Sequence, residues 1–337
     1  MDFPEKIKAG GWQSPGGFQM TNAVVISLGS INADFQVRVD CPPDLSGRVV
    51  IAEDFVRLSG GKAANVAFLA HRLGVATQLI GHVGDDDLKE QALRSLREIH
   101  LDLQYVQALT GQSTAVSMIA VPPDGKKGIL LAGNANYQWS QEDAAMVSQI
   151  IANAPSGSVL VVDYEISAFV VNQAILTAYE HNIPVILDPS LVKDVDRGLF
   201  SQINYIVPDA EETQQLTGIV IDSVKSAVEA GGNLVQQGVE NAVVKLQDGG
   251  CVLVNSEKII HVPPVPVDVV DATGAGDAFA GGLAVALVEK QSLVDALCFA
   301  TAAAHAAVTR YGSQPAYPRR SQINSLFKKI IDHVHFL

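Results

Sequence analysis

The chain has 337 residues, of which 48% are hydrophobic and 18% charged, so it can bury a large core and is not disordered in bulk. Its 36 acidic and 23 basic residues give a net charge of −13, which argues against nucleic acid and anionic lipid as partners. The mean hydropathy is +0.21, yet the most apolar stretch, 296–308, contains His305 and is shorter than the roughly 20 residues of a membrane span. We therefore expect a globular protein without a membrane-spanning segment.

Residues 1–20 mix Gly, Pro, Lys and Gln without periodicity and are predicted to form a mobile tail. They lack the continuous apolar core of a signal peptide, so we expect a cytoplasmic protein. The three cysteines, Cys41, Cys251 and Cys298, are odd in number and widely spaced, which fits neither a disulfide framework nor a metal site. We predict that they are thiols of the core.

The first predicted strand, 23–28, is a short apolar run that ends at Gly29, as buried strands do before a ligand-facing loop. Further along, four segments alternate partly between apolar and polar residues, which predicts a small antiparallel sheet with one solvated face. These segments are 35–40, 48–58, 114–121 and 128–131. After the acidic run 85–87, apolar residues recur at helical spacing, which predicts a helix.

From about residue 150 onward, apolar strands alternate with helical stretches. The predicted strands are 159–162, 184–187, 205–207, 242–246 and 251–255. Such alternation is typical of a parallel sheet, because each parallel connection needs a dozen or more residues. We predict an α/β fold of three layers over 21–330, with a mainly parallel central sheet between helices. The small sheet, from about 35–58 and 112–132, is an addition to this domain.

The sharpest motif is DATGAGD at 271–277, which is followed at once by an apolar helical run. Small residues before a helix leave backbone amides uncovered, and the helix dipole adds positive potential, so the motif suits a phosphoryl group. An ionised Asp277 at this position would be placed to act as a general base for a hydroxyl. The alternative is a tight turn in which Asp277 only caps the helix.

Two other motifs carry polar side chains beside glycine. In GGKAAN at 60–65, Lys62 and Asn65 supply donors for a polyhydroxylated or anionic ligand, although the glycines alone also fit a helix-entry turn. In GSINAD at 29–34, Asn32 and Asp34 alternate so that both lie on one face, as they also would in an Asx-rich turn.

In this order, GSINAD, GGKAAN and DATGAGD resemble the three hallmark motifs of the ribokinase family of carbohydrate kinases, also called the PfkB family. The resemblance extends from about Val24 to Phe327 and includes AAAHAAVTRYGSQP near the C-terminus. It implies ATP-dependent transfer of a phosphoryl group to a primary hydroxyl of a sugar. Asp277 would be the base, and the backbone amides of 274–277, with Gly274, Ala275 and Gly276, would form the anion hole.

The resemblance also implies a set of residues that hold the sugar hydroxyls and favours ribose as the acceptor. These residues are Asn32, Asp34, Gly61, Lys62, Asn65, Glu165 and Asp277. The small sheet would be the lid of the family, which closes over the sugar and forms a homodimer interface. Before the lid, the family's PxPGE segment is replaced by 42–47, which alters the approach to it.

Nucleotide and metal residues follow from the same resemblance. ATP would contact Lys245, Gln247, Gly250, Thr273, Gly274 and Gly276, although Gln247 departs from the usual Gly-x-x-Gly loop. Mg²⁺ would be held through water by Asp209 and Glu212, where the family has Asn in place of Asp209. Potassium would be bound at Asp271, Thr273, Ala307, Arg310 and Gly312, with Ala316 in place of a serine.

Alternative functions within the family are fructokinase, 2-keto-3-deoxygluconate kinase and nucleoside kinase. Lys62 and Glu165 resemble ribokinase more than the nucleoside-specific members and so favour a free sugar. An alternative of another class is a non-catalytic sugar-binding protein, motivated by Gln247 and Asp209 at nucleotide and metal positions.

Overall fold

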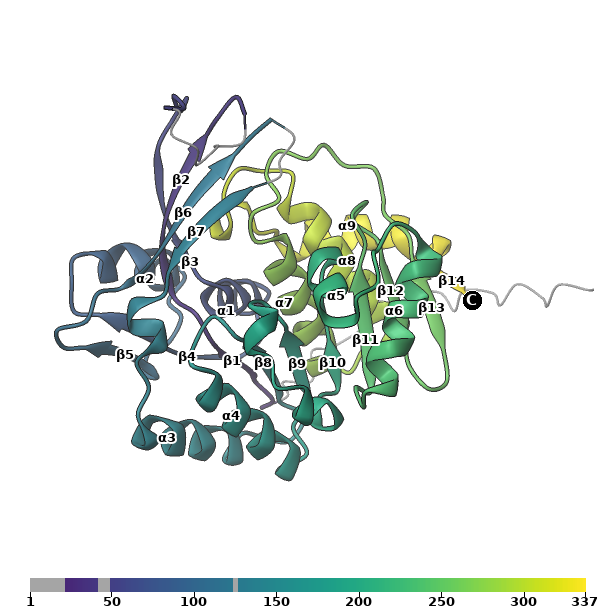
Figure 1. Cartoon of the computed structure of the whole chain (residues 1–337), viewed down its shortest axis with the longest axis horizontal. Helices are drawn as coiled ribbons and strands as arrows, with labels where there is room; N and C mark the ends of the chain where they lie inside the picture. The colour runs from purple at the N-terminus through teal and green to yellow at the C-terminus, as the bar shows by residue number, and fades with distance from the viewer. Residues whose placement is uncertain (1–21, 42–48, 124–126) are drawn as a thin grey trace, which may run out of the picture.

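The computed structural model describes residues 22–41, 49–123 and 127–337, so the tail predicted at 1–20 and the segment 42–47 lie outside the described residues. A ten-stranded sheet runs through the molecule in the order β14-β13-β12-β11-β10-β9-β8-β1-β4-β5 (Figure 1). All neighbours from β11 to β5 pair in parallel, and β11 to β14 pair antiparallel. The bounds of the strands are β1 Val25–Leu28, β4 Thr77–Gly84, β5 Val106–Leu109, β8 Val159–Asp163, β9 Val185–Asp188, β10 Tyr205–Ile206, β11 Asn241–Lys245, β12 Cys251–Val254, β13 Ile259–Val262 and β14 His335–Phe336.

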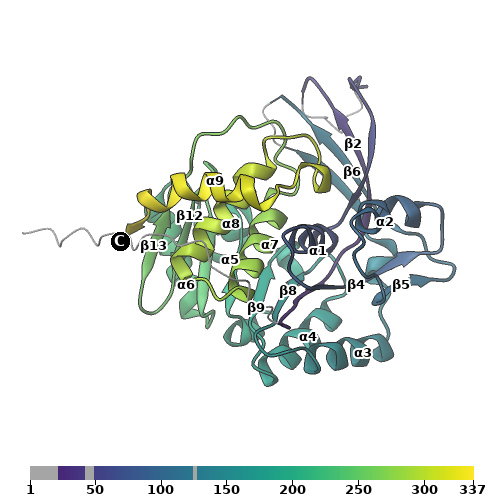
Figure 2. The ribbon, with the colours of Figure 1, turned by 180° about the vertical axis from the view of Figure 1, so that it is seen from behind.

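Helices cover both faces of this sheet and confirm the predicted three layers. Along each central strand, successive side chains enter opposite cores: Val161 packs on one face, whereas Leu160 and Val162 pack on the other. Because both faces are buried, these strands are continuous apolar runs. One face carries α1 Lys62–Arg72, α2 Leu88–Glu98, α7 Ala275–Val288, α8 Leu293–Ala307 and α9 Arg320–Ile330, seen from behind in Figure 2. The other carries α3 Gln141–Ala152, α4 Ala168–Glu180, α5 Ala210–Thr217 and α6 Val224–Gln236.

A second sheet of four strands, the lid sheet, stands beside the central sheet in the order β3-β2-β6-β7 (Figure 1). Its outer pairs are antiparallel, as predicted, while the middle pair β2 and β6 is parallel. Its strands are β2 Asn32–Arg38, β3 Val56–Gly60, β6 Ala115–Val121 and β7 Gly128–Ala132.

The lid sheet corrects one predicted strand boundary and confirms one predicted solvated face. Within the described part of the segment predicted at 48–58, a continuous strand forms only from Val56 onward. Before it, the amide of Glu53 donates to the carbonyl of Arg38, the amide of Arg38 donates to Asp54, and Ala52 forms an isolated bridge with Val39. The predicted solvated face is present, because Met118 on β6 and Leu130 on β7 are exposed, but side by side with Phe35 on β2 they make this part of the face apolar.

The cysteine prediction holds for two of the three residues. Cys251 and Cys298 are buried in the core, where burial raises the pKa of Cys251 to about 12, but Cys41 is exposed. None of the helices within the described ranges combines the length and the hydrophobicity that crossing a bilayer requires.

Candidate active site

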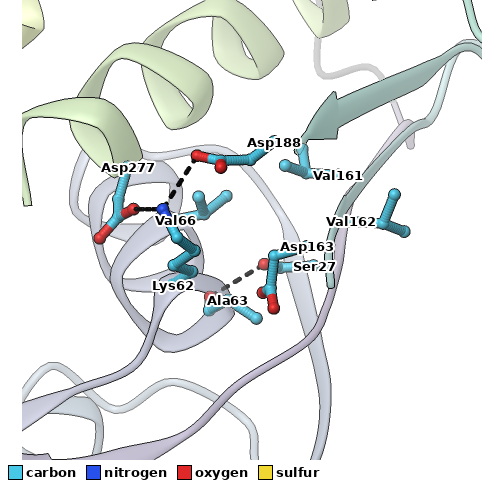
Figure 3. A pocket seen from close by; sticks show the side chains of 9 residues that line it. All are labelled: Ser27, Lys62, Ala63, Val66, Val161, Val162, Asp163, Asp188 and Asp277. Atoms are coloured by element: carbon cyan, nitrogen blue, oxygen red, sulfur yellow. Dashed lines mark hydrogen bonds and ion pairs between the residues drawn. The ribbon is translucent and has the colours of Figure 1, made fainter. Parts of the chain in front are cut away.

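The candidate site lies where the carboxyl ends of parallel strands meet the N-terminal ends of α1 and α7. Lys62, the first residue of α1, places its Nζ atom 3.2 Å from Asp188 Oδ2 at the end of β9 and 3.4 Å from Asp277 Oδ1 in the first turn of α7 (Figure 3). Asp163, the last residue of β8, lines the same small cavity. Open α/β sheets bind ligands at this edge, because loops after neighbouring strands converge there.

The start of α7 is a tight turn in which several backbone amides are uncovered. Gly274 precedes the helix with φ of 75°, and a Cβ atom there would lie 2.6 Å from the hydroxyl of Tyr317, so only glycine fits. Among the described residues, the amides of Gly274, Gly276 and Asp277 have no hydrogen-bond acceptor, whereas the amide of Ala275 donates to Ala272. The uncovered amides and the helix dipole together make a place for an anion.

Asp277 is 6% exposed, and side chains of the GGKAAN motif hold its carboxylate. Asn65 Nδ2 donates to Asp277 Oδ2 at 2.7 Å, and Gln314 Nε2 in turn donates to Asn65 Oδ1 at 3.0 Å. The second motif therefore orients the carboxylate of the third, which a helix cap alone does not require.

The cluster around Lys62 is strongly electrostatic. Burial opposes the charge of Lys62, but Asp188 and Asp277 raise the pKa of Lys62 well above its ordinary value. Burial likewise opposes the charge of Asp188, but Lys62 and Lys245 together lower the pKa of Asp188. Lys62 thus stays a cation between two carboxylates.

The other residues predicted to hold the sugar lie on β2 of the lid sheet, at the start of α1 and just after β8. Asn32 Nδ2 donates to Ser117 Oγ at 3.0 Å, and Asn136 Nδ2 donates to Asn32 Oδ1 at 2.8 Å. Glu165 Oε2 accepts from Ser30 Oγ at 2.9 Å, and Gly61 is the buried cap of α1. These contacts give Asn32 and Glu165 defined orientations.

Asp34 is buried on β2, and its Oδ1 atom has no hydrogen-bond partner within the described part of the chain. Burial, together with Glu165 and Asp277, raises the pKa of Asp34 to about 7, although a hydrogen bond from Ser117 opposes this. The folded chain therefore holds a proton that the unfolded chain releases near pH 3.8, so Asp34 lowers stability as pH rises between these two values.

We expect Asp34→Asn to raise the free energy of unfolding at pH 8, by up to about 4 kcal/mol, because no buried charge then has to form. Urea denaturation at pH 8 and pH 3 measures this, and the gain should nearly vanish at pH 3, where the Asp34 carboxyl group of the wild type is mostly protonated in both the folded and the unfolded state. The phosphoryl transfer that the sequence predicts should be slower in the same variant, since stability gained at a polar site costs function. An equal gain at both pH values would contradict the assignment.

The two predicted magnesium residues contact each other. Asp209 caps α5, its Oδ1 atom accepting from the amide of Glu212 at 2.8 Å, while Glu212 Oε2 accepts from the amide of Asp209 at 2.8 Å. Burial and the nearby Asp188 raise the pKa of Glu212 to about 7. One oxygen of each carboxylate lies outside this capping box, which fits a hydrated Mg²⁺ bound through water. No cluster of three or more His, Cys, Asp or Glu side chains suited to direct binding is found in the described ranges.

The two segments predicted to bind potassium are held side by side. The amides of Thr273 and Gly312 each donate to the Asp271 carboxylate at 2.8 Å, and the amide of Asp271 donates to the carbonyl of Val308. Gln36 of the lid strand β2 also donates to Asp271, at 2.5 Å. The hydroxyl of Thr273 is buried and has no partner among the described residues. Carboxylate and hydroxyl oxygens such as those of Asp271 and Thr273 are suited to bind a cation. Ala307 and Arg310 belong to the segment that leads to Gly312.

Three of the predicted nucleotide residues lie in and after β11, and the other three lie at the start of α7. Lys245 ends β11, and its Nζ atom is 3.2 Å from the point where a side chain on Gly276 would begin. Gln247 is exposed in the turn that follows, and the carbonyl of Gly250 accepts from the amide of Leu246. Lys245 is thus beside the uncovered amides, and Gln247 is at the surface.

Sequence reasoning missed several polar residues that the site contains. Asp188 is the partner of Lys62, Asn136 orients Asn32, and Gln314 supports Asn65. A signal for Asp188 was present, since it ends a buried strand as Asp163 does. Asn136 and Gln314 are in short irregular segments, where no local pattern indicates a role.

Comparison with known proteins agrees with this geometry. The model of the pfkB family carbohydrate kinases matches residues 22–320. The chain is 29% identical to the ribokinase of Haemophilus influenzae over 297 residues, which are 88% of this chain and 95% of that protein. It is also 29% identical to the deoxyribokinase of Salmonella typhi over 279 residues, 82% of this chain and 90% of that one.

Among solved structures, the ribokinase of Arabidopsis thaliana complexed with ribose and ATP superposes with a TM-score of 0.78. Its sequence is 29% identical, and the superposition covers 92% of this chain and 99% of that chain. The central sheet, the flanking helices and the lid sheet are therefore those of a ribokinase-like enzyme. The chain belongs to the pfkB family of carbohydrate kinases and is a sugar kinase.

Proposed function

We propose that this enzyme transfers the γ-phosphoryl group of ATP to the primary hydroxyl of ribose. The observation that carries the proposal is the placement of Asp277. Its carboxylate stands beside uncovered amides of α7 and is oriented by Asn65, within the cluster that also contains Lys62. A base and an anion-binding site side by side are what phosphoryl transfer to an alcohol requires.

In this mechanism, Asp277 takes the proton of the acceptor hydroxyl while the hydroxyl oxygen attacks the γ-phosphorus. The bond from the γ-phosphorus to the bridging oxygen breaks, ADP leaves, and the amides of Gly274, Gly276 and Asp277 stabilise charge on the transferring group. Asn32, Asp34 and Glu165 would hold the other sugar hydroxyls. Asp209 and Glu212 would hold Mg²⁺ through water, and this ion supplies positive charge to the phosphates.

ADP release from ATP with a panel of acceptors tests the proposal. The panel contains ribose, 2-deoxyribose, fructose, 2-keto-3-deoxygluconate, adenosine and inosine. We expect the highest kcat/KM for ribose. A preference for 2-deoxyribose is the second candidate, because the deoxyribokinase of Salmonella typhi is as similar as the ribokinase of Haemophilus influenzae. Preference for another acceptor would refute ribose, and silence across the panel would favour a non-catalytic binder.

Potassium should activate the enzyme through the loops at Asp271 and Gly312, because a cation there adds positive potential next to the anion-binding amides. We expect turnover to fall several-fold when potassium is replaced by an equal concentration of tetramethylammonium. Sodium and a choline salt serve as controls for ionic strength. Unchanged turnover would show that no monovalent cation acts at this site.

We also propose a homodimer through the lid sheet. Phe35, Met118 and Leu130 form an apolar row on its outer face, Phe55 stacks on Phe35, and Met118 and Leu130 are 58% and 55% exposed. Exposed apolar surface of this kind favours a protein partner. Light scattering should give about twice the mass of one chain, and Met118→Glu should give monomers; a wild-type monomer at working concentration would contradict the dimer.

The cytoplasmic location stays a prediction.

A further inference from the structure

Asp163 is a buried carboxyl group that the mechanism above does not use. It ends β8, is 2% exposed, and lines the cavity of about 10 Å³ that Lys62, Asp188 and Asp277 also line (Figure 3). Burial and the neighbouring Glu165 raise the pKa of Asp163 well above its ordinary value. A carboxyl group that is costly to bury and lies beside a reacting site has either a structural or a functional role.

The two oxygens of Asp163 accept hydrogen bonds from two different segments of the site. Oδ1 accepts from the amide of Glu165 at 2.9 Å, and Oδ2 accepts from the amide of Ser30 at 3.2 Å. These segments follow β8 and β1, which are neighbouring parallel strands. Gly29 leaves the room for this contact, because a Cβ atom at Gly29 would lie 1.8 Å from Oδ2.

The two segments that Asp163 ties together also meet through their side chains, one of which, Glu165, is proposed above to hold a sugar hydroxyl. Ser30 Oγ donates to Glu165 Oε2 at 2.9 Å and accepts from the amide of Lys62 at 2.9 Å. Asp163, Ser30 and Glu165 therefore form a closed ring of hydrogen bonds. Both hydrogen bonds that Asp163 accepts come from residues of this ring. A carboxyl group that only stabilised the core would instead bond segments outside the site.

We propose that Asp163 is a positioning residue for the acceptor sugar. By fixing the backbone of Ser30 and of Glu165, it holds the Glu165 carboxylate in the orientation that receives the sugar hydroxyls. This inference rests on the proposed function, because it assigns to Glu165 a contact with the acceptor.

Steady-state kinetics of Asp163→Ala test the proposal. We expect the KM for ribose to rise by about 10- to 100-fold, the range for losing a hydrogen bond to a charged group, while the KM for ATP changes less than about twofold. Asp163→Asn should be intermediate, because its Oδ1 atom still accepts from the Glu165 amide while its NH₂ group faces the amide of Ser30. This variant also serves if Asp163→Ala does not fold.

A double-mutant cycle with Glu165→Ala shows whether Asp163 acts through Glu165. In the Glu165→Ala background, replacing Asp163 by Asn should change kcat/KM for ribose by less than about threefold, because the side chain that it positions is gone. An equal loss in both backgrounds would overturn the proposal and leave a structural role only.

Ser158→Ala is the matched control. Ser158 lies at the opposite end of the same strand pair and accepts from the amide of Val24 at 3.0 Å, so its loss lowers stability without touching the site. We expect its KM for ribose to equal that of the wild type; a rise equal to that of the Asp163 variants would overturn the proposal. Inactivity of the wild type on the whole panel would overturn the proposed function and this inference together, whereas an active wild type with unchanged Asp163 variants would overturn the inference alone.

Discussion

Replacing Asp277 by Ala should lower kcat by about 10²- to 10⁴-fold, which is the contribution expected of a general base. The chain should remain folded, because Lys62 keeps its ion pair with Asp188 and the uncovered amides of α7 remain. The KM for ATP should change little, since the anion-binding amides are backbone groups. ADP release at saturating ribose, together with circular dichroism, measures both effects.

Asp277→Asn separates the base from the shape of the side chain. It preserves the volume and an oxygen that can accept from Asn65, but it cannot take a proton at neutral pH. The control is Asp295→Ala, which removes an aspartate from the first turn of the neighbouring helix α8 and should leave kcat unchanged. Near-full activity of either Asp277 variant would exclude this residue as the base and restore the helix-cap interpretation.

Replacing Lys62 by Met should lower the free energy of unfolding more than any other substitution considered for this protein. Lys62 is the cation between Asp188 and Asp277, and its removal leaves two neighbouring carboxylates whose side chains are only 5% and 8% exposed. Removing one partner of a buried ion pair costs about 3–5 kcal/mol, and the 22% exposure of Lys62 places the expected loss near the lower end, about 3 kcal/mol. Urea denaturation at pH 7 measures this loss.

The difference in the free energy of unfolding between the wild type and Lys62→Met should also depend on pH. The raised pKa of Lys62 contributes stability that is fully present below its ordinary value of 10.5 and is lost as pH rises through the folded value. The lowered pKa of Asp188 contributes stability above the ordinary value of 3.8, and this is lost as pH falls through the folded value. The free energy of unfolding of the wild type should thus exceed that of Lys62→Met throughout the neutral pH range, and the difference should narrow at low and at high pH.

Lys225→Met is the control for this variant, because Lys225 is an exposed lysine on α6. It should leave the free energy of unfolding within about 0.5 kcal/mol of the wild type. A loss in Lys62→Met no larger than this would mean that the cluster is solvated and that its charges are screened.

The α/β fold follows from the sequence alone. Parallel strands are buried on both faces and are therefore continuous apolar runs, and each crossover helix repeats its apolar positions at helical spacing. The same local rules apply to the start of α7, where small residues precede an apolar helix. The ends of the strands in the lid sheet were harder to predict. A short strand such as Val56–Gly60 begins where its partner strand begins to pair with it, and that partner is distant in the sequence.

The chemistry of the site was also readable in part. Asp277, Lys62 and Asn65 belong to motifs whose residue types suit phosphoryl transfer, and the structure brings these three together. The family resemblance implies Asp209 and Glu212 as magnesium residues, and the spacing of these two residues also makes a capping box at the start of α5. A local pattern can serve both purposes, so spacing by itself does not separate them.

Which charged side chains meet depends on contacts between residues that are far apart in the chain. Lys62 and Asp277 are 215 positions apart, and Lys62 and Asp188 are 126 apart, so their contact depends on the strand order that places β1 between β4 and β8. Likewise, Asp163 reaches Ser30 across 133 positions because β8 pairs with β1. The sequence determined which side chains were available and which elements carry them. Sheet order determined their partners, because a long-range contact is set by the packing of the whole sheet and not by residues near it in the chain.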